Sequence, residues 1–322
     1  MGLFLVTGGA GFIGSHLVEA LVGRGDRVRV LDDFSTSKDW GRLEHLDRGE
    51  LGSGASVELV EGSICDRDLV RAAADGVEGA FHEAAQVSVP LSVEQPERSL
   101  EVNVTGTANV LEAVRAGGGT KVVFAASSAA YGDGEELPKT EDLPVRPLSP
   151  YAVGKVAGEH LLRTWSHLFG LHTTALRYFN VFGPRQADDS PYTGVIAIFA
   201  KRLLAGEPIT IHGDGQQSRD FTFVSDVVAA NLLAMEGRHA SGGVYNVGAG
   251  GRVTVEQLYR ELAALAGVDA EPTFGPDRAG DVKHSCASLA RIRADLGYEP
   301  RVSFEEGLRT TFEWFRDRSA GA

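Results

Sequence analysis

The first segment of the chain constrains the fold most strongly, because it joins an apolar run, three evenly spaced glycines and an amphipathic stretch. Residues 3–6 are continuously apolar, which is typical of a buried parallel strand. Gly8, Gly11 and Gly14 follow, and residues 15–22 have helical spacing. Such glycines permit a tight turn, a close approach of a pyrophosphate and close helix–strand packing, while the helix N-terminus supplies amide donors. The segment therefore predicts a dinucleotide-binding turn.

The second expected strand, residues 28–31, ends in two carboxylates, Asp32 and Asp33. An acidic residue about 20 positions past the glycines can bind the 2′-hydroxyl of a ribose and would repel a 2′-phosphate. We therefore expect NAD and not NADP as the cofactor, with Asp32 as the main contact. The alternative is a solvated loop carboxylate.

Strands and helices alternate through the first half of the sequence. Further strands are expected at residues 57–60, 79–82, 121–125 and 173–178, and helices at 66–74, 96–114 and 151–169. Residues 35–56 predict a loop with a short helix. The alternation predicts an α/β fold with a Rossmann-type, doubly wound parallel sheet. Ligands bind such sheets beyond the carboxyl ends of the strands, where residues 84–88 and Ser127 also fall.

The second half has a looser pattern. Helices are expected at residues 195–205, 224–235, 255–266 and 304–316, and strands at 209–211 and 244–247. We predict an NAD-binding domain of residues 1–178 that is completed by about 224–250. Residues 179–223 and 251–322 are expected to form a smaller, discontinuous α/β lobe that binds the substrate.

Tyr151 and Lys155 are four residues apart, so they share one face of the expected helix. A phenol has a pKa of about 10 and is a poor base at neutral pH, but a nearby ammonium favours the phenolate and lowers that pKa. The pair therefore predicts a tuned general base. The alternative is a helix surface that happens to carry a tyrosine and a lysine.

The charge and cysteine content narrow the range of partners. A net charge of −13 argues against nucleic acid, although a locally positive pocket could still hold a small phosphorylated molecule. Cys65 and Cys286 have neither disulfide nor metal-site spacing, and a reducing cytoplasm is the expected compartment. We expect no metal, no signal peptide and no membrane span.

Several motifs occur in the order found in one known family. Residues 7–14, Asp32, Asn103, residues 127–132 and the Tyr151–Lys155 pair resemble the extended short-chain dehydrogenase/reductases. Residues 177–184, 213–220 and 278–281 resemble the nucleotide-sugar branch of that family. The similarity covers essentially the whole chain.

The resemblance implies a triad in which Tyr151 is the base, Ser127 its hydrogen-bond partner and Lys155 a ligand of the nicotinamide ribose. It also implies two sets of binding residues. The cofactor set is Gly8, Gly11, Phe12, Ile13, Gly14, Asp32, Asp33, Ser63, Ile64, Ala84, Ala85, Asn103, Ser127, Tyr151, Lys155 and Tyr178. The substrate set is Gln86, Ser88, Ser128, Asn180, Gly194, Val195, Thr210, His212, Arg219, Arg278 and Ser285. Salt bridges of Arg219 to Asp220 or Asp226, and of Arg278 to Asp281, are the alternatives.

The residues after Ser128 favour one reaction. Family members that dehydrate or decarboxylate the sugar carry a carboxylate there, whereas this chain has Ala129 and Ala130. The resemblance therefore implies C4 epimerisation of a UDP-hexose, either UDP-glucose/galactose or the N-acetylhexosamine pair, through a 4-keto sugar. A UDP-glucuronate 4-epimerase, another nucleotide-sugar dehydratase or decarboxylase, and an NAD-binding sensor without activity stay open as alternatives.

Further positions bear on the sugar and on assembly. A small residue at Ser285 and the sequence of residues 189–196 resemble the branch that accepts N-acetylated hexosamines. Ala187 stands where UDP-glucuronate epimerases carry an arginine, which argues against a UDP-glucuronate 4-epimerase. Ser63 stands where an aspartate commonly contacts the adenine of the cofactor. The family often forms homodimers through two helices per subunit, here expected at residues 98–115 and 151–169.

Overall fold

A computed structural model describes residues 2–187, 194–237, 241–276 and 282–320. The centre is a sheet of eight strands in the order β12-β7-β6-β5-β1-β2-β4-β3, and each pair in it is parallel. The strands are β1 (Leu3–Thr7), β2 (Arg27–Asp32), β3 (Arg48–Glu50), β4 (Val57–Glu61), β5 (Gly79–His82), β6 (Lys121–Ser127), β7 (His172–Tyr178) and β12 (Gly243–Val247). The predicted fold class, a Rossmann-type α/β fold with a doubly wound parallel sheet, is confirmed.

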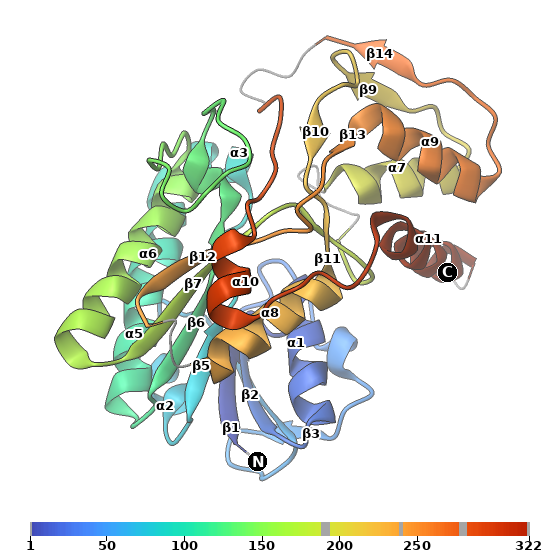
Figure 1. Ribbon diagram of the computed structural model, residues 1–322. Coiled ribbons are helices and arrows are strands. Elements are labelled where there is room, and N and C mark those ends of the chain that lie inside the picture. Colours follow the sequence, from blue (N-terminus) through green and yellow to red (C-terminus); the bar gives the residue numbers. More distant parts are fainter. Residues whose placement is uncertain (1, 188–193, 238–240, 277–281, 321–322) are drawn as a thin grey trace.

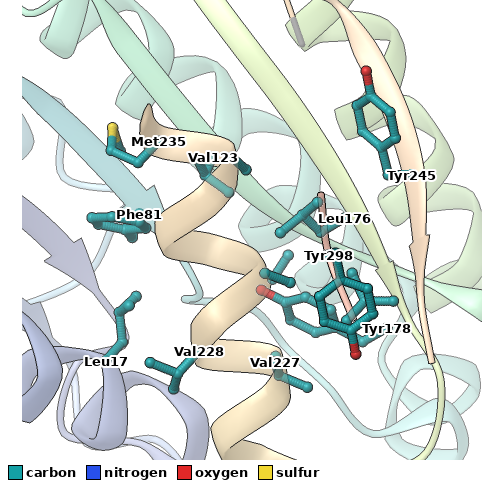
Figure 2. Packing of buried hydrophobic residues seen from close by; sticks show 14 of the residues in the cluster. Leu17, Phe81, Val123, Leu176, Tyr178, Val227, Val228, Met235, Tyr245 and Tyr298 are labelled. Atoms are coloured by element: carbon teal, nitrogen blue, oxygen red, sulfur yellow. The ribbon is translucent and has the colours of Figure 1, made fainter. Parts of the chain in front are cut away.

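Helices cover both faces of this sheet (Figure 1). One face packs against α1 (Phe12–Gly23) and α8 (Val224–Glu236), and the other against α2 (Arg67–Ala74), α5 (Thr107–Ala116) and α6 (Pro150–Phe169). Figure 2 shows α8 seated on the first face, with Val228 toward Leu17 of α1 and Val227 toward Tyr178 of β7. Because both faces are covered, the central strands β1, β5 and β6 are largely apolar, as the sequence indicates.

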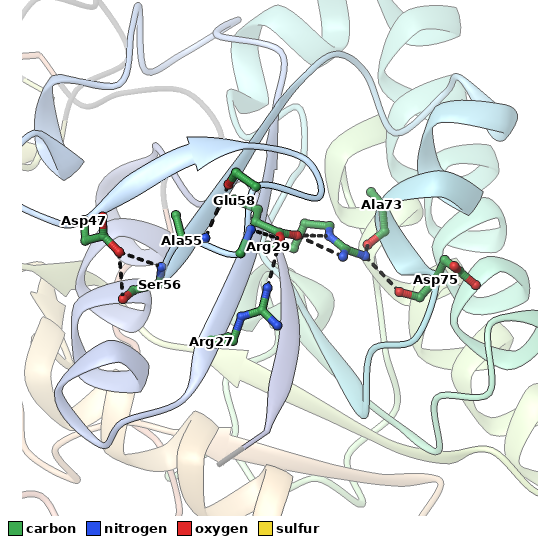
Figure 3. Close-up of polar contacts among 10 residues, drawn as sticks. Arg27, Arg29, Asp47, Ala55, Ser56, Glu58, Ala73 and Asp75 are labelled. Carbon is green, nitrogen blue, oxygen red and sulfur yellow. Dashed lines mark hydrogen bonds and ion pairs between the residues drawn. The ribbon is translucent and has the colours of Figure 1, made fainter.

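Charged side chains are nevertheless buried between β2 and β4. Arg29 donates to Glu58 at 3.0 Å and to the carbonyls of Ala73 and Asp75, both at 2.9 Å (Figure 3). Arg27 donates to the other oxygen of Glu58 at 2.9 Å. These bonds compensate the buried charges and hold the C-terminal end of α2 against the sheet.

Residues 96–116 are helical throughout, which agrees with the helix expected over residues 96–114, but a π-helical turn replaces the α-helical pattern at residues 101–106. The structure has α3 (Val89–Glu94), α4 (Pro96–Leu100), a π-helical turn η2 (Glu101–Gly106) and then α5. In this turn the Asn103 side chain bonds the backbone of residue 86, and Gly106 lies against Ile64 so closely that a Cβ would be 2.6 Å from the Ile64 side chain. Such turns are frequent at functional sites.

The remaining elements form a second lobe beside the carboxyl edge of the sheet (Figure 1). Three helices, α7 (Val195–Leu204), α9 (Val255–Ala266) and α11 (Phe304–Ala320), pack around a third apolar core. Three small two-stranded pairs accompany them: β8 (Val181–Phe182) with β11 (Thr222–Phe223), β9 (Thr210–His212) with β14 (Thr273–Gly275), and β10 (Ser218–Arg219) with β13 (Val253–Thr254).

Some short elements were not expected from the sequence. Strand β3 is an addition to the predicted loop of residues 35–56, in which η1 (Gly41–Leu43) is the short helix expected there, and α10 (Ala290–Leu296) and η3 (Ser128–Tyr131) are also additional. Each is seven residues or fewer, too short for hydrophobic periodicity to define. Within the described residues, no helix combines the length and apolar character needed to cross a membrane.

Candidate active site

The glycine turn between β1 and α1 is shaped for close approach to its backbone. Gly8 has a φ of +70°, and a Cβ on Gly14 would lie 2.2 Å from the Gly8 carbonyl oxygen. Helix α1 begins at Phe12, and the residue before it, Gly11, has no side chain to accept from the amides of Phe12 and Ile13. The turn therefore offers open N–H groups and a helix dipole to an anion, which fits the pyrophosphate of NAD.

Asp32 ends β2 next to this turn and is 8% exposed. One carboxylate oxygen accepts from the amide of Ala10 at 3.0 Å, and the other accepts from the Phe34 amide and the Ser37 hydroxyl, both at 2.9 Å. Asp32 thus holds the glycine turn and keeps lone pairs that can accept from a ribose hydroxyl. Asp33 accepts from the Ser35 amide in an exposed turn.

A buried chain of hydrogen bonds connects the glycine turn to η2 through His82, a residue that the sequence analysis missed. The Thr107 hydroxyl donates to the Asn103 carbonyl at 2.8 Å, so it accepts from His82 Nε2 at 3.0 Å. His82 Nδ1 then accepts from the Thr7 hydroxyl at 2.8 Å. Burial lowers the pKa of His82 to about 3, so the ring stays neutral and keeps this tautomer.

Asn103 positions the loop of small residues after β5. Its side-chain oxygen accepts from the Gln86 amide at 2.9 Å and its amino group donates to the Gln86 carbonyl at 3.0 Å. The Gln86 side chain donates to the Ser88 carbonyl, and the Ser88 hydroxyl caps α3 by accepting from the Leu91 amide. Asn103 therefore fixes the backbone that carries Ala84 and Ala85.

The residues expected near the adenine have local roles in the structure. The Ser63 hydroxyl accepts from the Cys65 amide at 3.2 Å. The side chain of Ile64 is buried in the core between α2 and α5, so its backbone is the part left to face a ligand. The Ile64 carbonyl accepts from Asn109 at 3.0 Å.

Tyr151 lies in the first turn of α6, and Ser127 lies at the end of β6. The Ser149 hydroxyl caps α6 by accepting from the Ala152 amide at 3.2 Å, Pro150 occupies the first turn, and Gly170 ends the helix with a φ of +69°. The Ser127 hydroxyl hydrogen-bonds the Tyr151 phenol and accepts from the backbone of residue 129. The structure thus brings these two members of the predicted triad together.

The expected effect of Lys155 on the Tyr151 pKa is wrong. Burial raises the pKa of Tyr151, and the hydrogen bond from Ser127 opposes that rise. The Lys155 ammonium lies 5.9 Å from the Tyr151 ring centroid and donates to the Ala125 carbonyl at 2.7 Å instead. Removing the phenolate from water therefore outweighs the stabilisation that its neighbours supply.

Lys155 itself is 3% exposed and packs over the ring of Phe124, 4.9 Å from its centroid. Burial lowers its pKa to about 8, and Glu83 opposes that decrease. Tyr178, expected among the cofactor contacts, directs its hydroxyl toward Glu83 and Asn231. Glu83 and Asn231 have no sequence motif and were not expected.

A cavity of about 560 Å³ lies between the end of β7 and the second lobe. Asn180, Gly194, Val195, Thr210, His212 and Arg219 line it, six of the predicted substrate-binding residues. Arg219 donates to the carbonyls of Ser218 and Lys283 at 3.0 and 3.3 Å. Since Tyr178 pairs with Ser127 across β6 and β7, Asn180 emerges just beyond the triad.

Asp220 holds the wall of this cavity and was not expected to do so. It is fully buried, and its oxygens accept from the amides of Ala249, Gly250 and Ala287 at 2.7, 3.1 and 3.0 Å. Asp226 likewise accepts from the amides of residues 301 and 302. Both carboxylates thus bind backbone amides, so the structure does not support a salt bridge with Arg219.

Other predicted substrate residues lie outside the cavity wall or outside the described residues. The Ser285 amide donates to the carbonyl of residue 218 beside β10, and Ser128 begins the turn η3 after β6. Arg278, with the expected motif at 278–281, and most of residues 189–196 are outside the described ranges. In the described part of the chain, no group of three or more His, Cys, Asp or Glu could hold a metal ion.

Comparison with known proteins agrees with this geometry. The profile of the NAD dependent epimerase/dehydratase family matches residues 4–248. The chain belongs to that family. NAD is its cofactor, and the glycine turn and Asp32 described above fit it.

The whole chain aligns with proteins of this family. A UDP-glucose 4-epimerase of Mycolicibacterium smegmatis is 43% identical over 98% of this chain and 99% of the relative. The structure of a UDP-glucose 4-epimerase of Thermotoga maritima with UDP-glucose is 39% identical, with a TM-score of 0.91 over 98% of this chain and 99% of that one. A UDP-N-acetylglucosamine 4-epimerase of Methanobrevibacter ruminantium, in complex with UDP-N-acetylmuramic acid, is 35% identical, with a TM-score of 0.92 over the same shares.

Proposed function

We propose that this protein is an NAD-dependent epimerase that inverts C4 of a UDP-hexose. The observation that carries the proposal is the placement of Ser127 and Tyr151 together at the carboxyl edge of the sheet, next to the end of β7, beyond which Asn180 lines a cavity of about 560 Å³. The relatives support the UDP-sugar class, since two UDP-glucose 4-epimerases and one UDP-N-acetylglucosamine 4-epimerase align with nearly the whole chain.

Tyr151 is the residue that transfers the proton in this reaction. NAD, when bound, would supply the hydride acceptor and donor. The Ser127 hydroxyl and the N-terminal dipole of α6 both favour the phenolate. Tyr151 then takes the proton of the C4 hydroxyl as C4 is oxidised to a ketone and returns it when the ketone is reduced from the other face.

Inversion requires that the 4-keto sugar turn over while its nucleotide stays in place. Asn180 and Arg219 line the cavity from two sides and can hold the diphosphate tether, for which arginine is well suited. Arg278 is proposed as a third anchor on sequence grounds. No carboxylate follows Ser128 in the turn η3, so the turn supplies no acid or base for elimination at C5 and C6.

The sugar is proposed to be glucose/galactose or their N-acetylated counterparts. The small side chain of Ser285 supports the larger N-acetyl substrates, and Ala187 argues against a carboxylated sugar. We also assign residues 1–178 with about 224–250 to cofactor binding, and residues 179–223 and 251–322 to substrate binding. The assignment to the cytoplasm remains a prediction from the sequence.

A homodimer through residues 98–115 and 151–169 is part of the proposal. Val153 on α6 is 43% exposed and Leu100 at the end of α4 is 38% exposed, so this helical face presents apolar side chains to solvent. Light scattering after gel filtration should give twice the mass of one chain. A Val153→Glu variant should give the monomer, and a monomeric wild type would contradict the assignment.

The direct test is incubation with UDP-glucose, UDP-N-acetylglucosamine and UDP-glucuronate separately, with the C4 configuration read by NMR. We expect conversion of a hexose or N-acetylhexosamine and loss of turnover in Tyr151→Phe, which should still bind NAD. A 4-keto-6-deoxy product or released CO₂ would indicate dehydration or decarboxylation. Tight NAD binding with no conversion of any sugar would favour a sensor.

A further inference from the structure

A polar cluster that the proposed mechanism does not use lies under the end of β6. Glu83 is the first residue after β5, and its carboxylate accepts from the Tyr178 hydroxyl at 2.8 Å. Asn231 of α8 donates to the same hydroxyl at 2.7 Å. These residues come from β5, β7 and α8, which meet around β6 because β6 pairs with β5 and β7.

Lys155 approaches the end of β6 from the opposite face of the sheet, near enough for its charge and that of Glu83 to affect each other. Its ammonium is buried and donates to the carbonyl of Ala125, two residues before Ser127 on β6. An ammonium removed from water is costly unless a negative charge compensates it. Glu83 is the group whose field raises the Lys155 pKa, and Lys155 in turn lowers the pKa of Glu83.

We propose that Glu83 is a positioning residue that keeps Lys155 charged and seated on the Ala125 carbonyl, and that Tyr178 and Asn231 hold the Glu83 carboxylate in place. The proposal deepens the proposed function, since it rests on Lys155 being part of the active site. It assigns to Tyr178 a task different from direct contact with the cofactor.

The surrounding groups set the pH range in which the Glu83 carboxylate and the Lys155 ammonium are both charged. Burial raises the pKa of Glu83 to about 7, against the hydrogen bond from Tyr178 and the charge of Lys155. Lys155 has a pKa of about 8, and His82 beside them stays neutral because its pKa is about 3. Tyr178 has a raised pKa and stays protonated at neutral pH, so its hydroxyl can donate to Glu83. The carboxylate and the ammonium are therefore both charged at about pH 7 to 8.

The pKa of Lys155 can be measured without any substrate. The full chain is labelled with ¹³C at lysine Cε, the Lys155 signal is assigned by its loss in Lys155→Arg, and its chemical shift is followed from pH 6 to pH 11. Glu83→Gln keeps an oxygen that accepts from Tyr178 but removes the charge, whereas Glu83→Asp keeps the charge on a shorter side chain. Thermal unfolding confirms that each variant is folded.

The charge of Glu83 predicts different results for the two variants. In Glu83→Gln the Lys155 pKa should fall by about one unit or more, because a neighbouring opposite charge typically shifts a pKa by that amount. In Glu83→Asp it should stay near the wild-type value. An unchanged pKa in Glu83→Gln, or an equal fall in both variants, would overturn the proposal.

Two further measurements extend the test. Tyr178→Phe removes the donor that stabilises the Glu83 carboxylate, so the Lys155 pKa should fall by less than in Glu83→Gln; a wild-type value would remove Tyr178 from the proposal. In turnover, Glu83→Gln should move the alkaline limb of kcat to lower pH with KM little changed, and an unmoved limb would count against it. Failure of all sugars to react would refute the proposed function and leave the lysine titration standing.

Discussion

Replacing Lys155 by Met should make the protein more stable at neutral pH while abolishing turnover. Burial lowers the pKa of Lys155 from 10.5 to about 8. At about 1.4 kcal/mol per pH unit, this corresponds to roughly 3 kcal/mol of destabilisation while the lysine is charged. Met is unbranched, flexible and uncharged, and it can occupy the same apolar space beside Phe124.

Three losses reduce that gain, and the first is small because Glu83, which loses the charge that lowers its pKa, can take up a proton at about pH 7. The Ala125 carbonyl loses its hydrogen bond from the ammonium, which is worth about 1 kcal/mol or somewhat more for a charged donor. The contact of the ammonium with the Phe124 ring, 4.9 Å from its centroid, contributes about 0.5–1 kcal/mol. The expected net change in the free energy of unfolding is therefore an increase of about 1–2 kcal/mol at pH 7.

The difference in the free energy of unfolding between Lys155→Met and wild type should depend on pH. The folded-state pKa of Lys155 lies below its ordinary value, so its cost is complete below pH 8 and disappears as the pH rises toward 10.5. Urea unfolding of wild type and Lys155→Met at pH 7 and pH 10 measures the difference, which should shrink at pH 10. Lys283→Met, on a side chain that is 69% exposed, is the control and should show no such gain. A variant less stable than wild type at pH 7, or a gain equal at both pH values, would contradict the claim that the buried charge of Lys155 destabilises the fold.

Three further substitutions test the cofactor turn, the cavity wall and the nucleotide site. Gly14→Ala should lower NAD affinity at least tenfold in calorimetry, because its Cβ would lie 2.2 Å from a carbonyl oxygen of the turn. Gly23→Ala is the control: its Cβ meets no atom within 4 Å, so this variant should bind NAD as wild type does. Asp220→Asn should lower the free energy of unfolding by about 2–4 kcal/mol in urea, because at least one of its three amide donors loses its acceptor. An unchanged unfolding midpoint would contradict this role of Asp220. Arg219→Ala should weaken UDP binding at least tenfold by calorimetry and leave NAD binding intact, and unaltered UDP affinity would exclude Arg219 as a phosphate anchor.

The main sheet could be predicted because its determinants are local. The apolar runs at 3–6 and 121–125 and the glycine turn between β1 and α1 are each contained within a few neighbouring residues. The π-helical turn inside the helix expected at 96–114 could not be predicted, because it depends on Asn103 and Gly106 meeting residues 86 and 64, which are distant in the sequence. Elements of two or three residues, such as β8 and β10, are too short to show a period.

The candidate site divides in the same way. Ser127, Tyr151 and Lys155 were found because they belong to a motif with fixed spacing. Glu83 and Asp220 were missed, because a carboxylate that bonds a tyrosine hydroxyl or three amides leaves no pattern in one sequence. The Tyr151 pKa was predicted in the wrong direction, since spacing along a helix gives no measure of burial.

The position of β12 at the end of the sheet has a consequence for synthesis of the chain. β12 pairs with β7, yet residues 179–242 are made between the two strands. Until residue 247 leaves the ribosome, β7 pairs only with β6, and the amides and carbonyls on its other side have no partner strand. A nascent chain stalled between residues 180 and 240 therefore exposes a pairing surface to other chains, and chaperone binding or aggregation should be greatest in that interval of translation.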